Sequence, residues 1–232
     1  MKSRQELKAE AKIAMAEQRG TAILLCLVLV VAVIVSSILD QIVLFATGGM
    51  GVLYWLVFWA GLLIIYVMGV NLLGEYIKIF KREKADVGAL FTELRVNFLR
   101  KLGGSLWMML FYFLWSLLFI IPGVVKMMSY YFTQNILADC PEVKATDAIK
   151  ISMKITQGHK MDVFVFILSF IGWFILSALT CGILYVVYVG PYFYSADAGF
   201  YLELKNKALA NGTITYEELG MVRPDSTEAY SN

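Results

Sequence analysis

The sequence predicts an all-α polytopic membrane protein, with six transmembrane helices arranged as three hairpins and both termini in the cytoplasm. Three observations predict this fold class. Hydrophobic residues make up 59% of the chain and charged residues 16%, whereas a soluble domain has about 45–50% apolar and about 25% charged residues. The apolar residues form long uninterrupted runs, which is typical of membrane spans. The positive charges, finally, are confined to a few segments between these runs.

Five runs are long enough to cross a membrane as a helix. They are residues 21–39, 51–73, 102–121, 163–180 and 183–201. Each has close to the roughly 20 residues that span about 30 Å of hydrocarbon at about 1.5 Å per residue. The first run is longer than a signal-peptide core and has no small-residue cleavage site, so we expect it to be retained as a span.

A sixth segment, residues 122–138, has an ambiguous hydropathy, because it is short and contains a lysine, a glutamine and an asparagine. Taken alone it could be a span, an interfacial helix or a loop. The distribution of the 20 Lys and Arg residues decides between these three alternatives. All but Lys126 lie in four segments, 1–20, 74–101, 139–162 and 202–232, whereas the connections 40–50 and 181–182 have none. Basic residues near span ends stay in the cytoplasm, and all four segments can share that side only if 122–138 crosses the membrane.

This threading divides the chain into three parts. Residues 1–20 form a cytoplasmic amphipathic helix and residues 21–205 the six-span membrane domain. Residues 206–232 form a cytoplasmic tail, partly disordered, because the composition turns polar from Thr213 onward.

Three cytoplasmic stretches share a spacing of basic, β-branched and bulky apolar residues that ends in glycine. They are KIAMAEQRG at 12–20, RVNFLRKLG at 95–103 and KISMKITQG at 150–158. They indicate three copies of one unit, an amphipathic helix stopped by glycine and followed by a two-span hairpin. Chance similarity among short basic helices is the alternative. We expect the helices to place their bulky residues in lipid or against the bundle, and their basic side chains toward anionic headgroups.

The candidate functional residues are polar groups at membrane depth. Asp197 lies in the inner half of the last span, Gln134 and Asn135 lie at a similar depth in the fourth, and Asn71 lies near the inner end of the second. A lone charge in hydrocarbon costs at least about 2.5–3.5 kcal/mol, so Asp197 should face partners, for which Asn135 and Gln134 are placed. The cluster is either structural glue between helices or a proton or cation site in a wet cavity.

Lys126 is the fifth candidate. It follows Pro122–Gly123, where we expect the outer turn between the third and fourth spans. From about one helical turn inside the boundary, its stem can lift the ammonium group to the headgroups, and chemistry inside the bilayer is the alternative. Asp40, beside the first outer turn, is the expected counter-charge. Asp197 is too far along the membrane normal, by about 12 Å, to pair with Lys126.

The sequence predicts no catalytic residue, no cofactor and no metal site, and so no enzyme. One histidine, His159, excludes paired-histidine zinc motifs, and three cysteines without paired spacing do not suggest a metal site or a disulfide framework. Gly158–Lys160 is expected to be a helix stop with interfacial cations. Asp197 is the only carboxylate well inside a span, although an intramembrane aspartyl site needs two. No nucleic-acid partner is expected.

Seven motifs resemble those of the bacterial integral-membrane family catalogued as domain of unknown function 975, over roughly residues 1–205. They are R-x-x-L-K-x-x-A at 4–11, I-P-G-V-V-K at 121–126, I-L-A-D-x-P at 136–141, A-I-K-x-S-M at 148–153, G-H-K-x-D at 158–162, L-S-F-I-G-W at 168–173 and P-Y-x-x-x-A at 191–196. The chain departs from the family at Thr21, where relatives often have an aromatic residue. The resemblance implies a multi-pass protein of the bacterial cytoplasmic membrane and implies no reaction.

The expected function is a non-enzymatic membrane scaffold, assembly or stress-associated protein. Its expected partners are anionic lipid headgroups at the basic helices, and a protein partner or a second copy of the chain. The alternative is a small transporter or channel that uses Asp197, Asn135 and Lys126. A lipid-modifying enzyme is a third, weaker alternative, since it would need a second buried acid or nucleophile beside Asp197.

Overall fold

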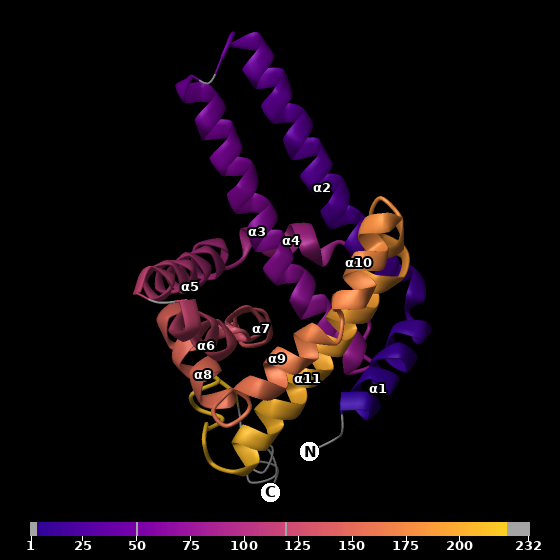
Figure 1. Ribbon diagram of the computed structural model, residues 1–232, viewed down its shortest axis with the longest axis vertical. Coiled ribbons are helices and arrows are strands. Elements are labelled where there is room, and N and C mark those ends of the chain that lie inside the picture. The colour runs from indigo at the N-terminus through magenta and orange to yellow at the C-terminus, as the bar shows by residue number, and fades with distance from the viewer. Residues whose placement is uncertain (1–3, 50, 119, 222–232) are drawn as a thin grey trace, which may run out of the picture.

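The computed structural model describes residues 4–49, 51–118 and 120–221, and these ranges are predominantly helical and contain no β-strand (Figure 1). The all-α prediction is therefore confirmed. Within these ranges, three helical stretches are long and apolar enough to cross a membrane, Arg19–Ala46, Val52–Phe80 and Lys160–Leu179. The chain is thus compatible with a membrane protein.

The helices of the described residues follow one another in this order: α1 Arg4–Glu17, α2 Arg19–Ala46, α3 Val52–Phe80, α4 Ala89–Arg95, α5 Phe98–Leu118, α6 Ile120–Tyr130, α7 Thr133–Asp139, α8 Ala145–Ile155, α9 Lys160–Leu168, α10 Ile171–Leu179, the π-helical η1 Tyr185–Val189, and α11 Gly190–Ala210. The segment expected as the fourth span is therefore two helices, α6 and α7, and the fifth is α9 and α10. The segment expected as the sixth span contains a π-helical turn, η1, shortly before Pro191. Proline has no N–H to donate, and its ring displaces the carbonyl four residues earlier, so a wider turn fits there.

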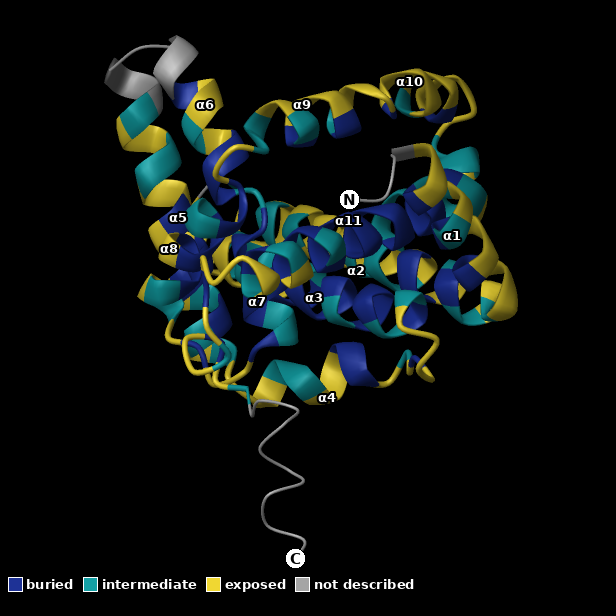
Figure 2. Cartoon of the chain, turned by 90° about the horizontal axis from the view of Figure 1, so that it is seen from below, coloured by how far each residue is buried: buried dark blue, intermediate teal, exposed yellow. Residues whose placement is uncertain are grey.

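Two helix pairs form hairpins that leave the body in different directions. Figure 1 shows α2 and α3 running side by side away from the other helices, joined by the turn that follows α2. Figure 2 shows α5 and α6 projecting from another side of the body. The described residues thus do not place these two hairpins parallel in one bundle.

The core lies where α11 crosses α3 and α1 (Figure 2). α11 is buried along most of its length, and the fully buried side chains include Phe132, Phe200 and Tyr201. Gly199 allows the close crossing of α11 and α3, because a Cβ atom there would lie 2.2 Å from the ring of Phe80. A side chain at this position would therefore require the Phe80 ring or the two helices to shift.

Helices α1 and α8 lie in segments that the sequence predicts to be amphipathic, and both bury apolar side chains against the protein. α1 buries Leu7, Ala11, Ala14 and Met15 and packs mainly on α11. Its Lys12 ammonium lies 5.1 Å from the centre of a ring on α11, that of Tyr192. Of the two positions that the sequence left open for the apolar faces, packing against the protein is the one observed for α1 and α8.

The expected glycine stop is found in one of the three proposed repeats. Gly158 has φ +80°, a conformation that glycine accepts at a helix end, and it follows α8. Gly20 lies inside α2 and Gly103 inside α5, so the prediction is wrong for these two. The break between α1 and α2 falls instead at Gln18, whose side chain donates to the Glu83 carbonyl and accepts from the Ala85 N–H. These two bonds to the loop after α3 hold the chain at the break.

Candidate functional site

Asp197 of α11 is buried, with 3% of its surface exposed, and both of its carboxylate oxygens accept hydrogen bonds. The Tyr131 hydroxyl donates to Oδ1 at 2.8 Å, and the Asn135 Nδ2 donates to Oδ2 at 2.9 Å. Tyr131 precedes α7 and Asn135 lies within it, so the Asp197 carboxylate connects α11 to the start of α7. We call these three residues the Asp197 cluster.

Gln134 does not join the Asp197 cluster, although it neighbours Asn135. Successive helical residues point about 100° apart, and the Gln134 amide instead donates to the hydroxyl of Tyr66 on α3. α7 thus uses adjacent amide side chains to contact two different helices.

Asn71 forms a second cluster, at the junction of α3, α4 and α5. Its Nδ2 donates to the Leu90 carbonyl at 3.1 Å, and its Oδ1 accepts from the ammonium of Lys101 at 2.6 Å. Lys101 is also buried and forms an ion pair with Glu93 at 2.8 Å. In the sequence Lys101 counts only as a boundary charge, so its buried contact with Asn71 is not predicted.

Lys126 lies apart from the other candidates, with its ammonium 4.7 Å from the centre of the Trp115 ring and 5.9 Å from that of Tyr130. The expected pair with Asp40 is not formed, since within the described ranges Lys126 has no carboxylate partner and Asp40 Oδ1 is buried without a hydrogen bond. A ring face attracts a cation through its quadrupole, and this contact takes the place of the counter-charge. The structure therefore brings together only Asp197 and Asn135 of the five candidate residues.

Among the described residues, Asp139, which in the sequence stands out only as part of a family motif, forms an ion pair in which both side chains are buried. The Asp139 carboxylate, at the end of α7, pairs with Lys205 of α11 and with Lys81, at 3.0 Å, after α3. The Tyr201 hydroxyl donates to Asp139 Oδ2 at 3.1 Å. Burial disfavours the charged carboxylate, but Lys205 and then Lys81 outweigh burial, so the pKa of Asp139 lies below its ordinary value. The spacing of Tyr201 and Lys205, four residues apart on one helix face, is the signal that could have indicated this site.

Arg100 of α5 binds the C-terminal end of α7, beside Asp139. Its guanidinium group donates to the carbonyls of Leu137 at 2.7 Å, Cys140 at 3.2 Å and Val143 at 2.7 Å. The last carbonyls of a helix have no partner within the helix, so Arg100 satisfies the C-terminal end of α7 from α5. Both ends of α7 are thereby fixed by charged side chains of other helices.

The cavities lie elsewhere. One is an apolar groove between α2 and α3, and another, a polar cavity of about 250 Å³, lies between the C-terminal ends of α8 and α11, beside His159 and Lys207. Neither is lined by Asp197, Asn135 or Asp139. Within residues 4–49, 51–118 and 120–221, no three His, Cys, Asp or Glu side chains converge as a metal site would require. Chemically, the polar clusters are suited to joining helices.

Comparison with known families gives one match. Residues 123–208 match the family described as "Protein of unknown function (DUF975)", so the resemblance seen in the motifs is confirmed. The matched segment contains Asn135, Asp139, Asp197 and Lys205, which form the Asn135–Asp197 and Asp139–Lys205 contacts between α7 and α11. No curated protein and no solved structure matches the chain.

Proposed function

We propose that the chain is a non-enzymatic scaffold or assembly protein of the bacterial plasma membrane that contacts anionic lipid. The observation that carries this proposal is the state of Asp197. Both oxygens of its buried carboxylate are occupied by protein donors, and it lines neither the groove between α2 and α3 nor the polar cavity beside His159. A transport site needs a carboxylate that solvent or substrate can reach.

Structural glue accounts for the same geometry. Hydrogen bonds between helices at membrane depth contribute about 0.6–2 kcal/mol each, and a carboxylate in hydrocarbon needs such partners to offset its desolvation. Tyr131 and Asn135 supply them to Asp197. In this proposal the Asp197 cluster fixes α7 on α11, and the protein presents a rigid surface to lipid and to a partner.

We also propose that the chain crosses the membrane six times with both termini inside. The distribution of Lys and Arg supports this threading. The start of α1 and the end of α11 lie at the end of the molecule opposite the α2–α3 turn (Figure 1), which fits two termini on one side. The threading requires the α5–α6 hairpin to turn toward the direction of the α2–α3 hairpin in the bilayer.

Contact with anionic lipid would be electrostatic. The apolar faces of α1 and α8 are used inside the protein, so lipid contact would come from well-exposed basic side chains such as Lys150, whose side chain is 68% exposed. Lysines near an anionic surface contribute about 1 kcal/mol each, and salt screens the attraction. Binding of the purified protein to excess anionic lipid should therefore weaken as salt is added.

The function is tested with Asp197→Asn in purified, reconstituted protein. We expect the melting temperature in detergent to fall, or a co-purifying partner to be lost, because the amide no longer attracts two donors equally. Asp147→Asn is the matched control, since Asp147 is an exposed acid paired with Lys150. If Asp197→Asn instead abolishes ion flux in proteoliposomes and keeps the parent melting temperature, the protein is the small transporter and the scaffold proposal is overturned.

The threading is tested with the natural cysteines. Cys181 is exposed, whereas Cys26 and Cys140 are buried. In intact cells a membrane-impermeant maleimide should label the parent at Cys181 and should not label Cys181→Ser. In a Cys181→Ser background, Lys150→Cys should react only after the membrane is permeabilised. Labelling at position 150 from outside would contradict six spans.

A further inference from the structure

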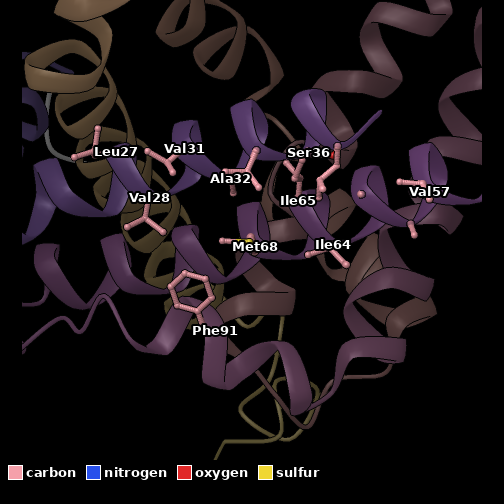
Figure 3. A pocket seen from close by; sticks show the side chains of 14 residues that line it. Leu27, Val28, Val31, Ala32, Ser36, Val57, Ile64, Ile65, Met68 and Phe91 are labelled. Carbon is pink, nitrogen blue, oxygen red and sulfur yellow. The ribbon is translucent and has the colours of Figure 1, made fainter. Parts of the chain in front are cut away.

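The groove between α2 and α3 is a cavity of about 670 Å³ lined by 14 residues (Figure 3). All of the lining side chains are apolar except Ser36, and none is charged. The groove runs along α2 from Leu27 to Leu39, and Phe91 of α4 lies across it near Met68 (Figure 3). The rest of the lining comes from α3, so three helices form this site.

The dimensions of the groove restrict what can occupy it. From Leu27 to Leu39 the helix rises by about 18 Å, which is close to half of the roughly 30 Å of hydrocarbon in a bilayer. The groove therefore has the length of a hydrocarbon chain in one leaflet.

The two helices touch within the groove. A Cβ atom on Gly61 would lie 2.3 Å from Oγ of Ser36, so α2 and α3 are in close contact at this point. The cavity is therefore bounded by a fixed helix crossing, and the helices cannot simply close upon it by approaching further there. A molecule other than this chain has to fill the remaining volume.

Hydrocarbon is the filling that the chemistry favours. Water in a cavity needs two to four polar partners, and the lining offers only Ser36. An empty cavity would lose the dispersion contacts of its walls. Both helices have the length and hydropathy of membrane spans, and most of their surface is unburied, so the groove opens toward lipid tails.

We propose that the groove between α2 and α3 binds one acyl chain of a membrane phospholipid. The inference rests on the proposed membrane-spanning position of α2 and α3, and it goes beyond the headgroup contacts proposed above. A bound chain would complete the packing of the hairpin, which has few protein neighbours along its outer half (Figure 1). The ligand class is a single flexible hydrocarbon chain.

The test uses the parent protein and a phosphatidylglycerol with a photoactivatable diazirine in one acyl chain. In bilayers, irradiation should label both groove residues such as Ile64 and Met68 and exposed residues outside the groove such as Leu56 and Leu62. After transfer to detergent and removal of bulk lipid, irradiation should still label the groove, at about one lipid per protein, and should no longer label the outer face. Loss of both labels together would overturn the groove proposal alone. Absence of outer-face labelling in bilayers would overturn the membrane-spanning position itself.

A matched pair of variants gives a second measurement. Ala32 lines the groove, whereas Leu62 of α3 is exposed and does not line it. Ala32→Phe should fill the groove and reduce retained lipid by at least about tenfold, whereas Leu62→Phe should retain it at the parent level. Equal retention in both folded variants would overturn the proposal. If Ala32→Phe does not fold, the labelling of the parent protein decides the question.

Discussion

Removing the charge of Asp139 should destabilise the protein strongly, because it leaves a buried ammonium group without its partner. The side chains of Asp139 and Lys205 are 5% and 6% exposed. Breaking a buried pair by removing one partner costs about 3–5 kcal/mol. Lys81 is 34% exposed, and exposed pairs contribute about 0–1 kcal/mol. Asp139→Asn should therefore lower the free energy of unfolding by about 3–5 kcal/mol, and Lys81→Met by less than about 1 kcal/mol.

The same carboxylate predicts how stability depends on pH. The pKa of Asp139 in the folded protein lies below its ordinary value of 3.8, because Lys205 and Lys81 outweigh the effect of burial. A lowered pKa means that the stabilisation is complete above the unfolded-state pKa and is lost as the pH falls through the folded-state pKa. The parent should thus lose stability as the pH falls below about 4, with a steeper slope than Asp139→Asn.

The assay is denaturant unfolding in detergent micelles, followed by tryptophan fluorescence at several pH values. The double variant Asp139→Asn, Lys205→Met should be less unstable than the sum of the two single variants, since neither charge is then left alone. Two results would refute the reasoning. One is a free energy of unfolding for Asp139→Asn that lies within about 1 kcal/mol of that of the parent. The other is a double variant whose loss in the free energy of unfolding equals the sum of the losses in the two single variants.

Two further predictions concern the packing around α11 and α7. Gly199→Ala should lower the free energy of unfolding by about 1–3 kcal/mol, because its Cβ meets the Phe80 ring at 2.2 Å. Gly69→Ala, with no atom near its Cβ, should leave the melting temperature within a few degrees of the parent. Equal melting temperatures for the two variants would contradict the crossing geometry. Arg100→Lys should lose about 1–3 kcal/mol and speed amide exchange in α7, since a lysine cannot supply the guanidinium fork to three carbonyls. Parent-like exchange in this variant would show that Arg100 does not hold α7.

How much of the fold could be predicted from the sequence depended on the range of the interaction. Hydropathy runs predicted helices because they depend on local composition, and the long apolar stretches in α2 and α3 are found. The breaks between α6 and α7 and between α9 and α10 could not be predicted, since tertiary contacts select them. Gly20 shows the same limit, because the break before α2 follows the contacts of Gln18 with the loop after α3.

The candidate site divides in a similar way. Depth along a span predicted that Asp197 and Asn135 could meet, and they are in contact. Depth says nothing of the direction around a helix, and so Gln134 was grouped with them although it faces Tyr66. Charge counting treated Lys205 as a topological marker, which concealed its role as a buried partner of Asp139. A sequence-based count assigns each basic residue to one purpose, whereas a folded chain can use it for two.

The packing of α1 on α11 has a consequence for biogenesis. A ribosome synthesises α1 first and α11 nearly last, so the apolar face of α1 lacks its main packing partner during most of translation. Until the closing helix emerges, that face must be shielded by lipid, by a chaperone or by the insertion machinery. Nascent chains halted before Gly190 should accordingly stay vulnerable to proteases near Leu7, and maturation should finish as a single late event.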